Sequence, residues 1–418
     1  MGRRGARLKT KKLFLLVLDG LGDRPFDGHS TPLAEAKTPV LAELARDGST
    51  GLIDPITPGT PAGSDTSHLS LLGYEPRVTY TGRGPFEAMG LGMEIWPGDI
   101  AWRCNFGTVE ESMMVTDRRA GRISEGTKEL CDSLNGMEID GVRVLVYPGV
   151  EHRAALVFRG PALSPAVSDV DPHEAGKKTQ ESWPMVREEA AARTARVLNH
   201  FVREAHKRLK SHEVNKQREA KGLPVANFLL PRGAGEVPRL QQLNERYEGF
   251  KAVCIAGIPL VRGICRLAGM QVPIVKGATG AKDSDLAAKA RAMLDAIKTN
   301  DMVLMNVKAP DVCGHDGDWQ GKKESIEKVD EMMRLIIDGL KGIECVVAVT
   351  GDHSTPIETR EHSGDPVPLV IWGPGVRKDR TAKFDEFECM NGGLGRMNGI
   401  SLMPMLMDLA NRSVKYGA

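Results

Sequence analysis

The sequence predicts an α/β protein whose mostly parallel sheet is interrupted by an inserted, smaller α+β unit. Apolar runs at residues 13–18, 303–307 and 345–349 each end at or just before an acidic residue, as buried parallel strands with functional loops do. Strands alternate with helices from about residue 226 to residue 418, which is typical of a parallel sheet. The same pattern begins at the N-terminus and breaks near residue 79, so an insertion is the simplest organisation.

The N-terminal part is predicted to form a strand and two helices. Residues 13–18, LFLLVL, are the strand, and residues 38–47 are a short helix. A second helix is predicted to begin at Gly63-Ser64, ahead of the apolar pattern LSLL. The serine there is either an N-cap or a nucleophile with backbone N–H groups nearby to hold phosphate.

The middle of the chain differs in character from both ends. Short strands separated by turns are predicted between residues 100 and 159, followed by a helical segment over 184–221. The second half of that segment is densely charged, which favours a solvated helix face over a nucleic-acid-binding arm. We expect residues 79–245 to form the insertion, and residues 1–78 and 246–418 to form one discontinuous unit.

Strands and helices resume after the insertion. Strands are predicted at residues 226–231, 250–257 and 272–277, with a helix between the last two. Residues 284–298 carry their apolar positions on one side and are predicted to form an amphipathic helix.

Composition excludes several classes of function. The chain has 418 residues, enough for two domains, and a net charge of +1, which predicts no broad attraction to nucleic acid or membrane. Aromatic residues make up 5%, which disfavours base-stacking surfaces, and no apolar stretch approaches membrane-spanning length. The first twelve residues are rich in Arg and Lys and are predicted to be a disordered basic tail, because the apolar run that follows is too short for a signal peptide.

The cysteines indicate a reducing compartment. There are seven, an odd number, and no CxxC occurs, so neither a disulfide framework nor a thiolate metal site is predicted. A cytoplasmic location fits this pattern.

Six acidic and imidazole side chains are predicted to gather at the carboxyl edge of the sheet. A single Asp after a strand is usually a turn or helix cap, but this combination is more specific because carboxylate and imidazole hold Zn²⁺, Mn²⁺ and related ions. The six residues are Asp19, Asp311, His315, Asp352, His353 and His362. One four-coordinate site with an open position needs fewer ligands, so two adjacent metal ions are predicted.

Two metals beside a serine suit phosphoryl transfer. The ions lower the pKa of an attacking hydroxyl and neutralise charge on the transferred group. The same ligands can activate water for hydrolysis, so the metals alone do not choose between a hydrolase and a transferase.

The motifs around these residues resemble a known family. VLDGLGD, AGSDTSH, PDVCGHDGD, TGDHSTP and HSGDPVP resemble the alkaline phosphatase superfamily. Together with YTGRGPFEAMG, DRRAGR, EHR, RGAG and GGLGRMNG, they resemble more narrowly the archaeal-type 2,3-bisphosphoglycerate-independent phosphoglycerate mutases. The resemblance spans nearly the whole chain and implies an alkaline-phosphatase-like fold.

The resemblance also implies a ligand set and a reaction. One metal would be held by Asp311, His315 and His362, and the other by Asp19, Ser64, Asp352 and His353. Ser64 would be the nucleophile, forming a phosphoserine while 3-phosphoglycerate and 2-phosphoglycerate interconvert without 2,3-bisphosphoglycerate. Manganese is the ion commonly used in such enzymes, and Zn²⁺, Co²⁺ or Mg²⁺ also suit these ligands.

In such an enzyme the insertion would be a lid that handles the substrate. A phosphoglycerate carries a carboxylate and a phosphate, and guanidinium groups bind both in bidentate fashion. The candidate substrate-binding residues are Arg103, Arg118, Arg122, Arg153, Arg232 and Lys276. Arg118 and Arg122 lie in DRRAGR, which resembles an arginine-bearing segment of the wider mutase family.

Three other functions stay open from the sequence. The first is a metal-dependent phosphatase that hydrolyses the phosphoserine, and the second is a mutase for another metabolite, such as a pentose phosphate. The third is a non-catalytic protein that binds metal or nucleic acid through the basic run at 203–221. The near-zero net charge and the full ligand set count against the third.

Overall fold

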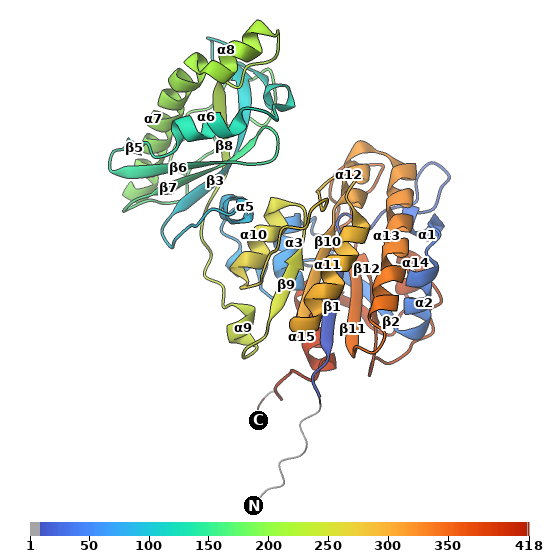
Figure 1. Cartoon of the computed structure of the whole chain (residues 1–418). Helices are drawn as coiled ribbons and strands as arrows, with labels where there is room; N and C mark the ends of the chain where they lie inside the picture. The colour runs from blue at the N-terminus through green and yellow to red at the C-terminus, as the bar shows by residue number, and fades with distance from the viewer. Residues whose placement is uncertain (1–8, 416, 418) are drawn as a thin grey trace, which may run out of the picture. The chain divides into compact units, whose positions relative to one another are not determined.

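The computed structural model describes residues 9–415 and residue 417, so most of the predicted basic tail lies outside the described residues. The chain divides into two compact units, which are described separately (Figure 1). Unit 1 combines the residues up to Thr79 with those from Leu240 onward, and unit 2 comprises Tyr80–Arg239.

Unit 1 is built on a seven-stranded sheet with the order β13-β2-β12-β11-β1-β10-β9. The strands are β1 (Lys12–Leu18), β2 (Ser49–Asp54), β9 (Ala252–Ile255), β10 (Met302–Val307), β11 (Cys345–Gly351), β12 (Val367–Trp372) and β13 (Gly395–Asn398). The central strand β1 runs parallel to β10 and β11, and β9 and β13 run parallel to their neighbours. Only β12 is antiparallel to the strands beside it.

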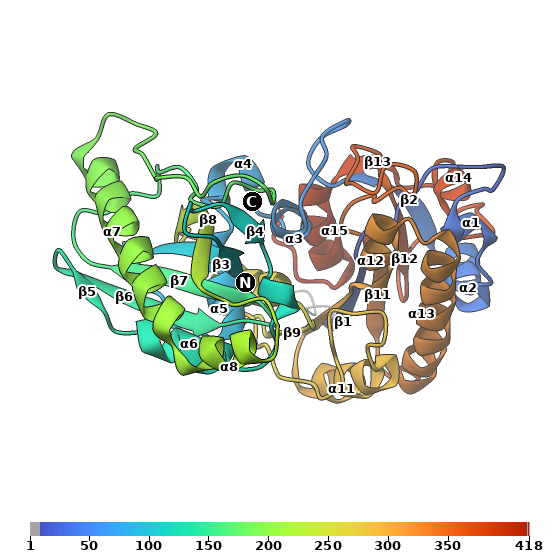
Figure 2. The same ribbon diagram turned by 90° about the horizontal axis from the view of Figure 1, so that it is seen from above.

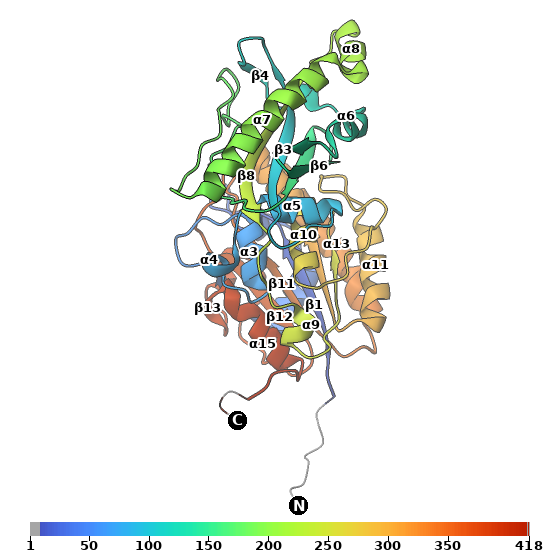
Figure 3. The same ribbon diagram turned by 90° about the vertical axis from the view of Figure 1, so that its left-hand side faces the viewer.

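Helices cover both faces of this sheet, which explains why β1 is apolar from Leu13 to Leu18. Phe14, Leu16 and Leu18 pack into a core cluster with α2 (Pro39–Asp47), α11 (Leu286–Thr299) and α13 (Trp319–Gly339). The alternate residues Leu13, Leu15 and Val17 are equally buried on the opposite face. Figures 2 and 3 show α3 (Ser64–Leu71) and α15 (Leu402–Leu409) on that face, and Figure 3 also shows α10 (Pro259–Leu267) there.

Short helices complete unit 1. They are α1 (Pro32–Glu35), α4 (Pro76–Thr79), α9 (Leu243–Arg246), α12 (Ala309–Asp316), α14 (Glu386–Cys389) and the 3-10 turn Gly399–Ser401. Of these, α12 follows β10 directly and matters most for the site described below.

Unit 2 is an antiparallel sheet with a long helix along one face (Figure 3). Its strands are β3 (Ile100–Val109), β4 (Val115–Asp117), β5 (Glu138–Ile139), β6 (Val142–Pro148), β7 (Arg153–Arg159) and β8 (Phe228–Glu236). Its helices are α5 (Gly84–Leu91), α6 (Thr127–Leu134), α7 (Glu189–Ser211), α8 (Glu213–Ala220) and the 3-10 turn Ala120–Arg122.

The two faces of the unit 2 sheet pack against different helices. Trp102 of β3 belongs to the core cluster that holds Phe201 of α7, and the Phe158 ring contacts both aromatic rings edge-on. On the other face, Ala88 of α5 packs against Ala101, Ala155 and Val157. Odd-numbered residues of β3 around position 101 therefore point away from α7.

The predicted fold class is confirmed, since a mostly parallel α/β unit carries an inserted α+β unit. The predicted strand at 272–277 is wrong. Only Gln271 forms a bridge, to Val253, and the chain then runs irregularly to a turn at Lys276. Pro273 lacks an N–H donor for a sheet, and Ile274 is 85% exposed, so the apolar letters there do not mark a buried strand. Among the described residues, no helix is both long and apolar enough to cross a membrane.

Candidate metal centre and arginine cluster

The predicted metal ligands come together at the carboxyl ends of three neighbouring strands of unit 1. Asp19 follows β1, Asp352 and His353 follow β11, and Asp311 and His315 lie on α12 just after β10. His362 lies on the loop before β12, and Ser64 is the first residue of α3. Because parallel strands end at one edge, residues far apart in sequence become neighbours here.

All seven residues were predicted as ligands, and five of the six carboxylate and imidazole side chains form two groups that can hold a metal ion. One group is Asp311, His353 and His362, and the other is Asp19, Asp352 and His353; within each group the ligand atoms lie within 4.8 Å of one another. His353 therefore belongs to both groups. His315 belongs to neither, although its Nε2 is 3.5 Å from Asp311 Oδ1.

The Ser64 hydroxyl points into this centre. Its Oγ lies 3.2 Å from His353 Nε2 and 3.5 Å from Asp19 Oδ1, and the residue is buried. Gly63 occupies the cap position of α3, and no side-chain capping bond is made there. The serine is thus the first helical residue and not an N-cap, so the structural alternative raised by the sequence does not apply.

Each imidazole of the centre is held by its Nδ1, which leaves Nε2 facing the carboxylates. His362 Nδ1 lies 2.8 Å from Ala62 O, and His315 Nδ1 lies 2.7 Å from Arg360 O. His353 Nδ1 lies 3.1 Å from Thr355 Oγ1, and that hydroxyl donates to Asp311 Oδ1 at 2.8 Å. Since a carbonyl oxygen can only accept, the Nδ1 atoms of His362 and His315 carry the proton, as metal-binding histidines require.

A lysine that sequence reasoning missed connects the carboxylates. Lys308 Nζ lies 2.7 Å from Asp19 Oδ1 and 2.6 Å from Asp311 Oδ2. Burial alone would raise the pKa of both carboxyl groups, but Lys308 and the neighbouring histidines outweigh it and hold both pKa values well below the usual range. Burial would lower the pKa of Lys308, yet Asp19 and Asp311 outweigh that effect and raise it.

The residues present fit divalent cations. Asp19, Asp311 and Asp352 are all buried, and Lys308 is the lysine that pairs with the first two. Asp352 Oδ2 is buried without a hydrogen-bond partner, which is costly for a carboxylate oxygen unless a cation binds it. The surplus of buried negative charge and this unpaired oxygen both favour metal binding.

Unit 2 collects arginines on the face of its sheet opposite α7. Arg103 on β3 is directly opposite Arg232 on β8, and Arg153 lies opposite Asn105, two residues along β3. Burial, reinforced by Arg83, Arg232 and Arg153, lowers the pKa of Arg103 to about 9, although Glu87 acts in the opposite direction. Arg103 Nε is buried without a hydrogen bond, 3.8 Å from Glu87 Oε1. This face therefore carries positive charge that an anion would balance.

One buried carboxylate holds two of these arginines in place. Arg118 donates to Asp171 from Nε at 3.0 Å and from Nη2 at 2.6 Å, and Arg232 Nη1 donates to Asp171 at 2.7 Å. Burial would raise the pKa of Asp171, but the bond from Arg118 and the neighbouring charges lower it. Asp171 was not among the predicted residues.

The remaining predicted substrate residues are less enclosed. Arg122 and Arg153 are exposed, and both lower the pKa of the nearby His152, to about 4, after the larger effect of burial. Five of the six predicted residues thus lie in unit 2. Arg153 and Arg232 are close enough to lower the pKa of Arg103, so these three arginines form one cluster. Lys276 lies apart, on an exposed turn of unit 1.

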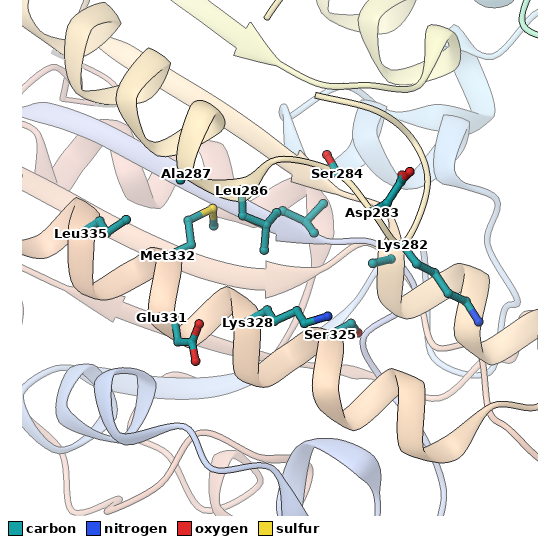
Figure 4. Close-up of a pocket in the computed structure, with 12 residues that line it drawn as sticks. Lys282, Asp283, Ser284, Leu286, Ala287, Ser325, Lys328, Glu331, Met332 and Leu335 are labelled. Atoms are coloured by element: carbon teal, nitrogen blue, oxygen red, sulfur yellow. The ribbon is translucent and has the colours of Figure 1, made fainter. Parts of the chain in front are cut away.

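A cavity of about 540 Å³ in unit 1 is not the metal centre. It lies between α11 and α13 and is lined mainly by their side chains, among them Leu286, Met332 and Leu335 (Figure 4). Val307 and Ala309 also line it, on either side of Lys308. None of its lining residues is a predicted metal ligand.

Comparison with known proteins assigns the family. A family model described as 2,3-bisphosphoglycerate-independent phosphoglycerate mutase matches residues 45–215. An enzyme of that name from Methanococcus maripaludis is 48% identical over 407 residues, covering 97% of this chain and 100% of the relative. The chain belongs to this family. A relative from Methanocaldococcus jannaschii, 2,3-bisphosphoglycerate-independent phosphoglycerate mutase 1, is 47% identical and covers 98% of this chain and all of its own.

Two solved structures resemble this member of the family along nearly their whole length. A protein of Pyrococcus horikoshii is 39% identical, with a TM-score of 0.86, and the match covers 98% of this chain and 100% of that one. The cofactor-independent phosphoglycerate mutase of Thermoplasma acidophilum is 40% identical, with a TM-score of 0.71 and coverage of 96% and 100%.

Lys308 and Asp171 differ in how far the sequence could have revealed them. Lys308 lies three residues before Asp311 in NVKAPD, so its place on the strand-end loop was available from the sequence. Asp171 lies in the irregular segment between β7 and α7, and only the folded sheet brings it to Arg118 and Arg232.

Proposed function

We propose that this protein is a 2,3-bisphosphoglycerate-independent phosphoglycerate mutase, an isomerase that interconverts 3-phosphoglycerate and 2-phosphoglycerate in the cytoplasm. The observation that carries the proposal is the placement of Ser64 Oγ beside Asp19 and His353 in a carboxylate and imidazole centre. The family supports the same reaction, since its members are named for it.

In this proposal the centre holds two divalent ions, with Mn²⁺ as the working ion and Zn²⁺, Co²⁺ or Mg²⁺ as substitutes. Asp311, His315 and His362 hold one ion, and Asp19, Ser64, Asp352 and His353 hold the other. His353 belongs to both groups of candidate ligands, which supports two ions bound next to each other on either side of that residue. His315 would join its group by turning its Nε2, now 3.5 Å from Asp311 Oδ1, toward the ion.

The reaction proceeds by two displacements at phosphorus. Ser64 Oγ loses its proton and attacks the phosphate of 3-phosphoglycerate, forming a phosphoserine as the bond to the glycerate 3-oxygen breaks. The freed glycerate takes up a proton and reorients. Its 2-hydroxyl then loses its proton and attacks the phosphoserine, forming 2-phosphoglycerate as the bond from phosphorus to Ser64 Oγ breaks, and Oγ takes up a proton to regenerate Ser64. The bound ions lower the pKa of the attacking hydroxyl and neutralise the phosphoryl charge.

The chain's own residues supply position and charge for these steps. Gly63 leaves Ser64 at the N-terminal end of α3, where backbone N–H groups favour an anionic phosphate. Lys308 adds an ammonium beside Asp19 and Asp311, suited to the same phosphate. Because the phosphate stays on the protein between the two steps, no bisphosphoglycerate is needed.

Unit 2 holds the glycerate in this proposal. Arg103, Arg118, Arg153 and Arg232 are the main candidates, with Arg122 and Lys276 as further ones. The buried Nε of Arg103, which makes no hydrogen bond, supports an anion at that position. The chain crosses between the units twice, near residues 79–80 and 239–240, and we propose that these crossings act as hinges that let unit 2 close as a lid.

The deciding experiment separates a mutase from a phosphatase. Protein stripped of metal by chelation and reconstituted with Mn²⁺ is given 3-phosphoglycerate without 2,3-bisphosphoglycerate, and both 2-phosphoglycerate and free phosphate are measured. The proposal predicts 2-phosphoglycerate as the main product with slight phosphate release. Phosphate as the main product would identify a phosphatase, and turnover of a pentose phosphate alone would identify a different mutase.

A further inference from the structure

A second layer of buried polar side chains lies beneath Asp19, Ser64 and Asp352. Asn306, near the end of β10, donates from Nδ2 to Asp19 Oδ2 at 3.1 Å and lies 3.5 Å from His68 Nε2. Both Asn306 and His68 are almost completely buried. Neither residue has a part in the reaction described above.

His68 connects this layer to the nucleophile. It lies one turn after Ser64 on α3, and its Nδ1 lies 2.7 Å from Ser64 O and 3.6 Å from Asp352 Oδ2. Because the Ser64 carbonyl can only accept, Nδ1 carries the proton and Nε2 is left as an acceptor for the Asn306 amide. The two amide hydrogens of Asn306 are thereby divided between Asp19 and His68.

Asn306 is itself fixed by a buried lysine. β9 pairs with β10 only as far as Met305, so the next carbonyl, that of Asn306, takes its hydrogen bond from another source. Lys289 of α11 donates to it from Nζ at 2.7 Å, with almost no exposure to solvent. Placing an ammonium in the core is costly, which argues that this one bond has a purpose.

We propose that Asn306, held by Lys289, is a positioning residue of the metal centre. Its amide occupies the outer oxygen of Asp19, so that Oδ1 is directed toward Ser64 and His353. Through His68 it also fixes the first turn of α3 and therefore the direction of Ser64 Oγ. Such outer partners of metal ligands typically change metal affinity 10- to 100-fold when they are removed. This inference rests on the two-metal site of the proposed function.

The test compares metal binding in three variants of the full-length protein. Asn306→Leu removes the amide at similar volume, and Lys289→Met removes the ammonium. The matched control is Asn215→Leu in unit 2, since the Asn215 amide is equally buried and bonds to Leu209 O and Ala226 O, far in sequence from any ligand. Each metal-free protein is titrated with Mn²⁺, with free Mn²⁺ followed by electron paramagnetic resonance and folding by circular dichroism.

We expect Asn306→Leu to lower the affinity for one of the two Mn²⁺ ions about 10- to 100-fold and to leave the affinity for the other unchanged. Lys289→Met should lower the affinity for the same ion to a smaller extent, and Asn215→Leu should lower the affinity for neither ion. Activity of Asn306→Leu should recover when Mn²⁺ is raised to saturate the weakened site, which a general loss of structure would not allow.

Several outcomes overturn the inference. Wild-type affinity for both ions in folded Asn306→Leu contradicts it directly. If that variant does not fold, unchanged affinity in Lys289→Met contradicts it instead, and so does equal weakening in the Asn215→Leu control. If the wild-type protein binds no Mn²⁺, the proposed two-metal function fails first, and the two failures are thus told apart.

A spectroscopic measurement needs no metal. Nitrogen-15 NMR of the imidazoles distinguishes a ring protonated at Nδ1 from one protonated at Nε2. His68 should be protonated at Nδ1 in both metal-free proteins, because the Ser64 carbonyl accepts that proton, but the Nε2 resonance should shift in Asn306→Leu, which lacks the amide donor. An unchanged Nε2 resonance in the variant would count against a role for Asn306 in orienting His68.

Discussion

Unit 1 gathers carboxylates at the ends of parallel strands, whereas unit 2 gathers guanidinium groups on the face of an antiparallel sheet. In unit 1, Asp19 and Asp352 are the first residues beyond two adjacent strands, so the topology alone makes them neighbours. In unit 2, Arg103 and Arg232 meet because β3 and β8 pair in a particular register. The candidate cation site thus results from where parallel strands end, and the arginine cluster results from the register in which antiparallel strands pair.

The two regions also differ in how their charge is balanced. In unit 1, three buried carboxylates carry more negative charge than Lys308 can balance, and one carboxylate oxygen of Asp352 has no hydrogen-bond partner. Unit 2 has the reverse surplus, with Asp171 shared by Arg118 and Arg232 and with Arg103 only partly balanced by Glu87. The charge of the first region favours a cation and that of the second favours an anion, and the following changes test the two regions separately.

The largest effect is expected from damage to the metal centre. Asp352→Asn removes a buried ligand charge, so Mn²⁺ occupancy should fall and kcat should drop about a thousandfold, because the ions stabilise the transition state by several kcal/mol. Elemental analysis and a coupled mutase assay measure both. Asp330→Asn is the matched control, since Asp330 is also buried but only accepts from Val40 N and Leu41 N. Full activity in thoroughly metal-free wild-type protein would refute the requirement for metal.

Asp171→Asn should affect unit 2 without affecting metal binding. The change leaves two arginines without their buried counter-charge, so the free energy of unfolding should fall by about 3 kcal/mol. kcat/KM for 3-phosphoglycerate should fall about a hundredfold while Mn²⁺ affinity stays the same. Asp99→Asn is the control, because Asp99 holds Arg159 in a similar pair elsewhere in unit 2. Equal losses of kcat/KM in the two variants would show that Asp171 has no specific role in positioning the arginines for 3-phosphoglycerate.

Arg103→Met removes a guanidinium that has no hydrogen bond of its own at Nε. KM for 3-phosphoglycerate should rise about tenfold to a hundredfold, the value of a charge-assisted hydrogen bond. Stability in urea should not fall, because a buried charge next to other arginines is removed. Arg143→Met on β6 provides an exposed control. An unchanged KM together with lower stability would mark Arg103 as structural.

The smallest effect is a pH dependence in unit 2. Burial and the surrounding arginines lower the pKa of His152 to about 4, so the unfolded chain binds a proton between pH 6.5 and 4 that the folded protein does not. His152 should therefore lower the free energy of unfolding as pH falls through that window. Urea unfolding of wild type and His152→Gln should diverge below pH 6.5 and agree above it. Identical unfolding free energies of the two proteins at every pH would show that the arginines do not lower the pKa of His152.

The candidate metal centre could largely be predicted from the sequence because Asp19, Asp311 and Asp352 lie in short motifs that follow strands. The strands themselves were evident, since β1, β10 and β11 are buried on both faces and read as continuous apolar runs. The antiparallel β12 was not foreseen, because its apolar run does not reveal its direction. The strand expected at 272–277 failed because local apolar letters do not establish burial.

The arginine cluster was only partly predictable. The arginines themselves could be named from short motifs, but their partner Asp171 is separated from Arg118 by 53 residues and from Arg232 by 61. Lys289 and Asn306 illustrate the same limit, since nothing in an amphipathic helix distinguishes a lysine that turns inward. Contacts of this kind depend on how helices and strands pack, which a single sequence does not state.

The phosphoserine tests the central claim most directly. Enzyme supplied with Mn²⁺ and 3-phosphoglycerate is quenched with acid during turnover, digested, and analysed by mass spectrometry. The account predicts a phosphate on the peptide that contains Ser64, and it predicts that Ser64→Ala keeps its fold but loses both the label and mutase activity. Phosphate on a different residue, or substantial mutase activity in Ser64→Ala, would contradict it.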